Sequence, residues 1–163
     1  MLINLGLGIA TMAVCLALQI ALLTRALLYY AHHHPGTHSM SFFGLMGVLN
    51  GVMLLLMVGN LAQTALWAML FLFLGEFSEY RTAFYHSAVN FATLGYGDIV
   101  MSESRRILGP VQAMNGILMV GVTTAAFMTV LRDALKHAAR AMLSEDAGAV
   151  ERLVDPKNSS DEV

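Results

Sequence analysis

Three long apolar runs constrain the fold of this chain more than any other feature. They cover about residues 3–24, 43–74 and 107–131, and each is at least as long as the roughly 20 residues that cross the hydrocarbon core of a bilayer. Only 12% of the 163 residues are charged, about half the share in a soluble domain. The runs therefore predict an all-α membrane protein with three transmembrane helices in a lipid bilayer.

The first run is expected to be a retained helix and not a signal peptide. No Lys or Arg precedes Arg25, and no small-residue cleavage site leads into a polar segment. Arg25 after the first run, and Arg132, Lys136 and Arg140 after the third, place these flanks in the cytoplasm by the positive-inside rule. We expect the N-terminus and residues 75–106 outside and the C-terminus inside. A net charge of −2 without a dense basic patch argues against nucleic acid as a partner.

The segment between the second and third runs is too polar and too short to cross the membrane. Residues 78–92 suit a short helix with Ser78 as its N-cap, and at about 14 residues this helix spans only about 21 Å. The chain must therefore enter the membrane and return on the same side. Non-helical backbone at membrane depth has to be buried in protein or to line water. We therefore expect a symmetric oligomer with the returning loop at its axis.

The returning loop has the sequence TLGYGD, residues 93–98. A backbone that turns successive carbonyls toward one axis must alternate between right-handed and left-handed conformations, and glycine adopts the left-handed one without steric cost. Gly95 and Gly97 alternate with Leu94 and Tyr96 as this geometry requires. The loop is therefore predicted to present a column of carbonyl oxygens to the axis.

The remaining side chains of the loop suit the same arrangement. The hydroxyl of Thr93 can extend the carbonyl column, and Tyr96 can point outward and brace the loop. Repeated copies of Asp98 would form an anionic ring at the outer mouth, which concentrates cations. The C-terminal end of the preceding helix adds a partial negative charge that also favours a cation.

At these residues the sequence resembles the potassium channel superfamily. The resemblance covers about residues 55–131. Two segments, LWAMLFLFLGEFSEYRTAFYHSAVNFATLGYGDIV and RRILGPVQAMNGILMVGVTTAAF, resemble more specifically a group of small bacterial channels that have one extra N-terminal helix. It implies a homotetramer in a bacterial plasma membrane and no catalysis. It also implies no organic cofactor and no small-molecule substrate other than permeant ions. K⁺ ions would bind in the filter formed by Thr93, Leu94, Gly95, Tyr96 and Gly97.

The sequence pattern and the resemblance together divide the chain into three parts. Residues 1–42 would form the N-terminal transmembrane helix and a histidine-rich cytoplasmic linker. Residues 43–131 would form the pore domain, with outer helix, pore helix, filter and inner helix. Residues 132–163 would form a short cytoplasmic amphipathic helix and a disordered tail.

Four residues near the filter depart from the family pattern. Ala92 replaces a threonine, and Val89 stands where one bacterial branch has a buried glutamate that pairs with the residue equivalent to Asp98. Tyr85 and His86 stand where two aromatic residues usually form a cuff around the filter. His86 has three open roles: a hydrogen bond to Tyr96, simple packing, or sensing of protons.

The third run contains two glycines with two possible roles. The resemblance places Gly121 at the gating hinge, and Gly116 is a second candidate, but small residues also let helices pack closely. Polar side chains within the runs are expected to bond across helices or to face water. These are Asn60, Gln63, Thr64, Asn115, Thr123, Thr124 and Thr129.

The linker HHHPGTH leaves a different class of function open. His32, His33, His34 and His38 suggest a metal or proton sensor, although three consecutive histidines cannot all converge on one ion from a regular helix. The favoured reading is a plain linker without a metal. Three functions remain: a potassium-selective channel, a weakly selective cation channel, and a non-conducting membrane sensor.

Overall fold

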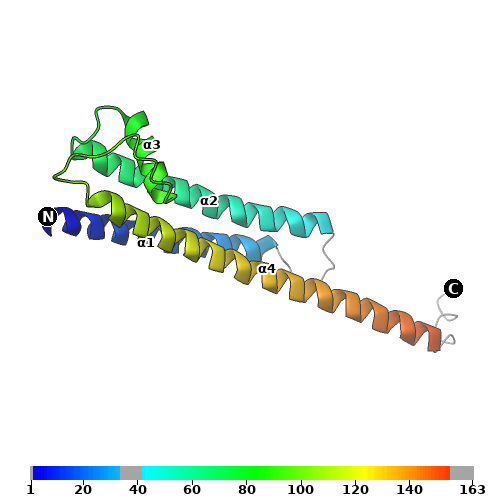
Figure 1. The fold of residues 1–163 in the computed structure, drawn as a ribbon. Helices are drawn as coiled ribbons and strands as arrows, with labels where there is room; N and C mark the ends of the chain where they lie inside the picture. The colour runs from blue at the N-terminus through cyan, green and yellow to red at the C-terminus, as the bar shows by residue number, and fades with distance from the viewer. Residues whose placement is uncertain (1, 34–41, 155–163) are drawn as a thin grey trace.

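Helices are the only regular secondary structure in the residues that the structure describes. The computed structural model describes residues 2–33 and 42–154, and these contain no strand. Its four helices are α1 (Leu2–His33), α2 (Phe42–Phe73), α3 (Tyr80–Phe91) and α4 (Leu108–Val154) (Figure 1).

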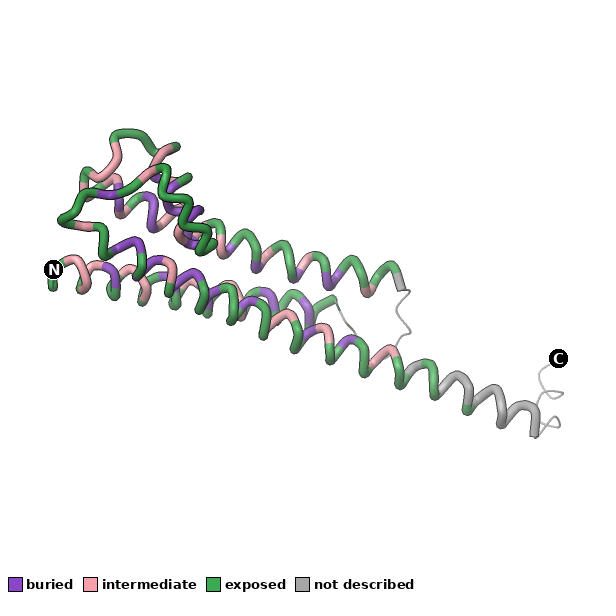
Figure 2. Tube along the Cα trace, in the orientation of Figure 1, coloured by how far each residue is buried: buried purple, intermediate pink, exposed green. Residues whose placement is uncertain are grey.

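Three of the helices are long and apolar enough to cross a membrane, which confirms the prediction of three transmembrane helices. The candidate spans are Leu2–His33, Phe43–Phe73 and Leu108–Arg140. Exposed residues line much of the outer flanks of these helices (Figure 2). Many of the exposed side chains are large and apolar, as expected of surfaces that contact lipid.

The short helix α3 and its flanking loops lie at one end of the three long helices. The N-terminus lies at the same end, and α4 extends past α1 and α2 toward the C-terminus at the opposite end (Figure 1). Both α1 and α3 pack on α2 and α4. The first helix therefore packs on its own chain.

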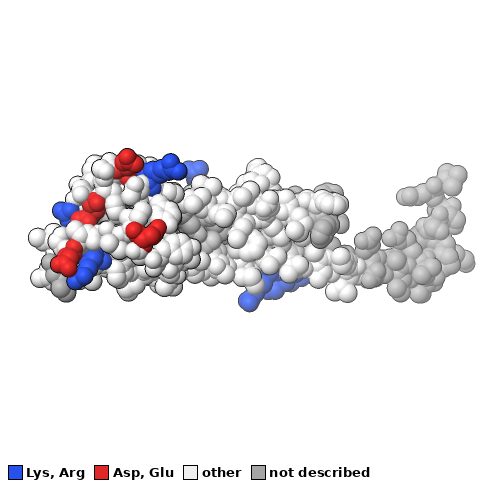
Figure 3. Space-filling view, turned by 45° about the horizontal axis from the view of Figure 1, so that its top comes forward, with Lys and Arg blue, Asp and Glu red and all other residues white. Residues whose placement is uncertain are grey.

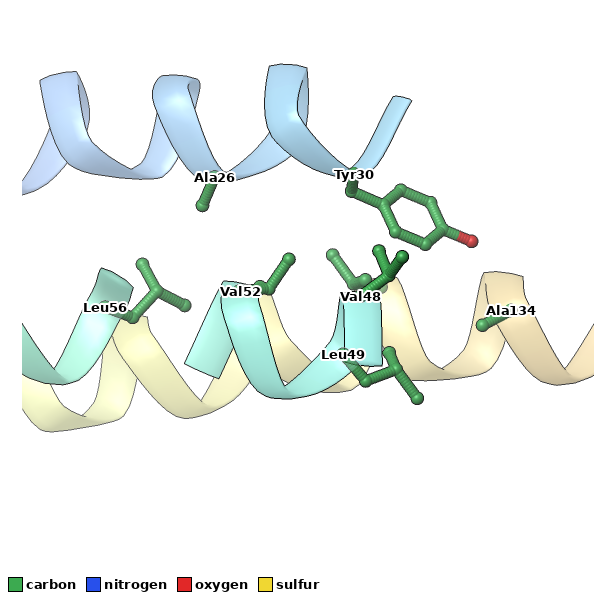
Figure 4. Packing of buried hydrophobic residues seen from close by; sticks show 8 residues of the cluster. Ala26, Tyr30, Val48, Leu49, Val52, Leu56 and Ala134 are labelled. Atoms are coloured by element: carbon green, nitrogen blue, oxygen red, sulfur yellow. The ribbon is translucent and has the colours of Figure 1, made fainter. Parts of the chain in front are cut away.

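Two buried apolar clusters hold the long helices together. One joins α1, α2 and α4 in the half that lies away from α3: Ala26, Tyr30, Val48, Leu49, Val52, Leu56, Val130 and Ala134 (Figure 4). The other lies beneath α3 and its loops: Cys15, Trp67, Phe71, Met101, Leu108 and Val111. Close helix approach helps this packing, since a Cβ on Gly59 of α2 would come within 2.6 Å of Leu22 in α1.

The helix ends differ from the sequence prediction in two places. α1 continues to His33, and α4 continues without a break to Val154, so no separate amphipathic helix begins after Leu131. Residues 132–147 contain neither Gly nor Pro, and Ala, Leu, Lys and Arg are good helix formers, so nothing ends the helix there. The tail expected to be disordered, DPKNSSDEV, is residues 155–163, which lie outside the described residues.

Candidate functional site: a loop at the C-terminal end of α3

The short helix α3 delivers the TLGYGD loop. It has 12 residues and is therefore about 18 Å long, as expected of a helix that does not cross a membrane. The prediction of Ser78 as N-cap is wrong. Glu79 occupies that position with extended backbone, and its side chain makes no capping hydrogen bond.

α3 ends in a pattern of hydrogen bonds that places a threonine in an unusual conformation. The N–H of Leu94 donates to the carbonyl of Val89, and the N–H of Thr93 donates to that of Asn90, both at 2.9 Å. This is a Schellman motif, whose left-handed residue is usually glycine. Here the left-handed residue is Thr93, with φ of 59°.

The end of α2 shows the usual form of the same motif. The N–H of Glu76 bonds to Phe71 and the N–H of Gly75 to Leu72, and Gly75 has φ of 73°. A β-branched residue with positive φ is an outlier, and such strain persists only where the surroundings enforce it. The role predicted for Thr93 from the sequence concerns its hydroxyl and does not include this backbone conformation.

The backbone of the loop alternates as predicted for its glycines. Thr93, Gly95 and Gly97 have φ of 59°, 57° and 73°, whereas Leu94 and Tyr96 do not have positive φ. All residues from 92 to 98 are exposed in the single chain. Leu94 and Tyr96 are 54% and 65% exposed, so two large apolar side chains of this loop lack cover within the chain.

The outer end of the loop is held by Tyr85. Its hydroxyl donates a hydrogen bond of 2.8 Å to Oδ2 of Asp98, and this bond raises the pKa of Tyr85. Val89, one turn further along α3, is buried and apolar. Tyr85 was predicted to support the loop, but its bond to Asp98 was not predicted.

His86 anchors the chain that follows the loop. Its Nδ1–H donates to the carbonyl of Ile99 at 2.9 Å, and Nδ2 of Asn90 donates to its Nε2 at 2.9 Å. The ring also packs on Phe71 and Phe77, with centroids 5.7 Å and 5.0 Å away. Burial lowers the pKa of His86, and both hydrogen bonds fit the neutral ring. Within the described chain, His86 therefore binds Ile99 and Asn90 in place of Tyr96.

Buried hydrogen bonds between polar groups join α3 to α2 and α4. Ser87 in α3 donates through its hydroxyl to the carbonyl of Thr64 in α2 at 2.7 Å. Nε2 of Gln112 in α4 donates to the carbonyl of Ser87 at 3.1 Å, and it also contacts the Ser87 hydroxyl. Neither Ser87 nor Gln112 was predicted to bond here, although a glutamine within an apolar run was a signal for Gln112.

The two candidate hinge glycines have different surroundings. A Cβ on Gly116 would lie 2.0 Å from the carbonyl oxygen of Phe91, so α4 approaches the end of α3 closely enough to require glycine. A Cβ on Gly121 would meet nothing within 4 Å. Close packing therefore accounts for Gly116, while nothing in the described chain requires a glycine at position 121 for space.

A carboxylate outside the membrane spans ties the loop after TLGYGD to the end of α2. Glu76 accepts hydrogen bonds from the N–H of Ser102 at 2.7 Å, from its hydroxyl at 2.8 Å and from Nη1 of Arg105 at 3.1 Å. Arg105 also binds the carbonyl of Leu74. Burial alone would raise the pKa of Glu76, but these bonds from Ser102 and Arg105 lower it overall. Acidic and basic side chains gather at this end of the molecule (Figure 3).

A cavity of about 310 Å³ opens between the loop and α4. Its lining includes His86, Asn90, Thr93, Gly95 and Arg106. The described chain therefore leaves space beside Thr93 and Gly95, in keeping with the exposure of the loop.

The histidine linker is only partly within the described residues. His32 and His33 lie in the last turn of α1, and Nδ1 of His33 donates to the carbonyl of Tyr29 at 2.9 Å. His34 and His38 lie outside the described residues. Over residues 2–33 and 42–154, no group of three or more His, Cys, Asp or Glu is placed to hold a metal ion.

The comparison with protein families matches this part of the chain. Residues 60–133 match the model of a family described as "Ion channel". Residues 60–133 are an ion-channel domain. The domain takes in the second half of α2, α3 with its loop, and α4 as far as Asp133. No curated protein and no solved structure matches the chain. With its three candidate spans, the chain is a multi-pass membrane protein in which α1 precedes the ion-channel domain.

Proposed function

We propose that this ion channel is a potassium-selective channel with residues 93–97 as its filter. The observation that carries the proposal is the alternating backbone of the loop, with left-handed residues at Thr93, Gly95 and Gly97. This alternation turns successive carbonyl oxygens toward one side, and such carbonyls replace the hydration shell of K⁺ in a filter. The C-terminal end of α3 points its partial negative charge at the same loop.

The proposed channel is a homotetramer with the loop at its axis. A single loop cannot enclose an ion, and its exposed Leu94 and Tyr96 lack cover in one chain. Four copies would bring their carbonyls together as cages for K⁺ and bury these side chains. Four copies of Asp98, each bound by Tyr85, would form the anionic outer mouth.

The proposed location is a plasma membrane, of the bacterial inner membrane type, with the filter mouth outside. The N-terminus lies at the same end of the long helices as α3 (Figure 1), and three crossings place the cytoplasmic part of α4 on the other side. The basic residues Arg25, Arg132, Lys136 and Arg140 would then lie near the cytoplasmic face, as the positive-inside rule favours.

Flux through the purified protein tests this function. In liposomes with opposing K⁺ and Na⁺ gradients, the wild-type reversal potential should follow the K⁺ gradient, and Ba²⁺ should block the current. A reversal potential that follows neither gradient would indicate a weakly selective cation pore. No cation flux at all would contradict a channel.

A glycine pair supplies the matched substitution. Gly95→Ala should abolish selectivity, because alanine strains a left-handed position by about 1–2 kcal/mol and disturbs the carbonyl column. Gly75→Ala introduces the same strain at φ of 73° but lies at the end of α2, so selectivity should persist. Equal selectivity in the two variants would contradict the assignment of the filter.

A further inference from the structure

Hydrogen bonds join α1 to α4, and to the loop just before α4, at three positions along α1. Nδ2 of Asn4 donates to the carbonyl of Ser104 at 2.7 Å, just before α4 begins. Nε2 of Gln19 donates to the hydroxyl of Thr123 at 3.0 Å, and the hydroxyl of Tyr30 donates to Oδ2 of Asp133 at 3.0 Å. The last two pairs are 104 and 103 residues apart in sequence, so α1 and α4 run parallel in nearly constant register.

The middle contact is buried and joins three helices. Gln19 also accepts a hydrogen bond of 2.6 Å from Nε2 of Gln63 in α2. Gln19, Gln63 and Thr123 are all buried. Apolar contacts between helices gain no hydrophobic driving force in lipid, so polar contacts of this kind help to fix the register. Gln19 therefore holds α1, α2 and α4 together at one height.

The space around the glycines of α4 changes just before the contact between Gln19 and Thr123. Gly116 is confined by the carbonyl of Phe91, but Gly121 has open space around it. Thr123 follows two residues later. The part of α4 before Gly121 thus packs on α3 and on α1, whereas the part beyond Gly121 packs on α1 and α2.

The inner contact is the one that bending would break. Asp133 lies 12 residues beyond Gly121, which is about 18 Å along a helix. A kink of about 20° at Gly121 would move Asp133 sideways by roughly 6 Å, twice the length of a hydrogen bond. Tyr30 cannot readily follow, because it is buried among Val48, Val130 and Ala134 in the cluster shown in Figure 4.

We propose that α1 is a brace that sets the equilibrium between straight and bent α4, and that Tyr30–Asp133 is its releasable contact. Tyr30 is a positioning residue here, because it acts on the channel through Asp133. The effect on conduction rests on the proposed function, but the effect on the shape of α4 does not.

Distance measurements on the full-length protein test the brace. Spin labels at Leu28 in α1 and Leu135 in α4, both exposed, report their separation by pulsed EPR in liposomes. Labelled chains are diluted with unlabelled ones so that distances between copies do not contribute. Tyr30→Phe should raise the population ratio of the long to the short distance about threefold to tenfold.

The neighbouring tyrosine is the matched control. Tyr29→Phe removes the same atom one residue earlier, where no hydrogen bond of the hydroxyl is found among the described residues, so the distances should stay as in wild type. Asp133 also pairs with His137 at 3.5 Å. Asp133→Asn should therefore change the distances less in the Tyr30→Phe background than in wild type, because the Tyr30–Asp133 bond is already broken there. Equal distances in the Tyr29 and Tyr30 variants, or fully additive effects in the double variant, would overturn the brace.

The same variants separate the brace from the proposed function. If the protein conducts K⁺, Tyr30→Phe should change its open probability and Tyr29→Phe should not; an unchanged open probability would overturn the regulatory role of the brace. If the protein conducts no K⁺, the proposed function fails, and the EPR distances alone decide whether α1 braces α4.

Discussion

The end of this molecule that carries α3, which is the outer end in the proposed topology, and the opposite, inner end are held together in different ways. At the outer end, polar bonds surround the loop: Tyr85 binds Asp98, His86 binds Ile99, and Glu76 binds Ser102. At the inner end, an apolar cluster and few polar contacts join α1, α2 and α4. The strained backbone of Thr93 needs surroundings that leave it no alternative. Helices packed through apolar side chains in lipid can shift with less cost.

The largest expected effect breaks the joint between α3 and α4. Gly116→Ala places a Cβ 2.0 Å from the backbone oxygen of Phe91, which cannot move without displacing the start of the loop. We expect a loss of at least about 3 kcal/mol in unfolding free energy. Unfolding of the purified protein in mixed micelles by increasing SDS measures it.

Gly121→Ala is the matched control for the inner end. Its Cβ meets nothing within 4 Å, and alanine favours helix over glycine by up to about 1 kcal/mol. The variant should therefore be as stable as wild type or slightly more stable. If both alanines destabilise the protein equally, the contrast between a fixed outer joint and a free inner one is wrong.

The next effect concerns the carboxylate of the outer loop. Glu76→Gln removes a charge whose side chain is only 4% exposed and which accepts three hydrogen bonds. We expect a loss of about 1–3 kcal/mol, measured by the same unfolding assay. Glu103→Gln is the control, because Glu103 is 93% exposed and reaches Arg106 only at 4.0 Å. It should change little.

Acid should reproduce the effect of Glu76→Gln. The pKa of Glu76 is lower in the folded chain than its ordinary value of 4.5. Its stabilisation is therefore complete above that value and is lost as the pH falls through the folded pKa. Lower hydrogen-exchange protection factors in residues 99–106 below about pH 4.5, seen in wild type and already present at neutral pH in Glu76→Gln, would show this. Equal protection in both proteins at neutral pH would contradict it.

The smallest effect is a second acid-dependent step at His86. Its folded pKa lies below the ordinary 6.5, so the unfolded chain takes up a proton first as the pH falls. Stability should be constant above about pH 6.5 and should decline below it until the folded pKa is reached. His86→Gln should remove this decline, whereas His137→Gln should keep it. A decline that persists in His86→Gln would assign the step to another group.

Much of the fold could be predicted from the sequence because the membrane limits the possible structures. Long apolar runs in lipid form helices, so α2 and the three-span arrangement were predicted nearly as they are. The left-handed conformations of Gly95 and Gly97 followed from glycine chemistry. The ends of α1 and α4 were not predicted, because continuation past an apolar run depends on the absence of breakers and not on hydrophobicity.

The supports of the loop were harder to predict than the loop. The partners in these bonds lie far apart in sequence, and no periodic pattern marks them. Glu76 bonds to Ser102, Ser87 bonds to Thr64, and Gln112 bonds to Ser87. The sequence predicts that His86 lies beside the loop, but it does not predict its hydrogen-bond partners Ile99 and Asn90. The left-handed Thr93 was missed, because threonine does not favour that conformation by itself.

The sequence by itself determined three apolar helices, a short helix that does not cross the membrane, and a glycine-alternating loop. These follow from local chemistry: hydrophobic length, helix length and the freedom of a residue without Cβ. Only the tertiary structure decided that Gly116 is a packing residue, that Tyr85 holds Asp98, and that α1 lies in register along α4. Such facts depend on distances between residues remote in sequence, which close packing of whole helices sets and no short stretch of sequence contains.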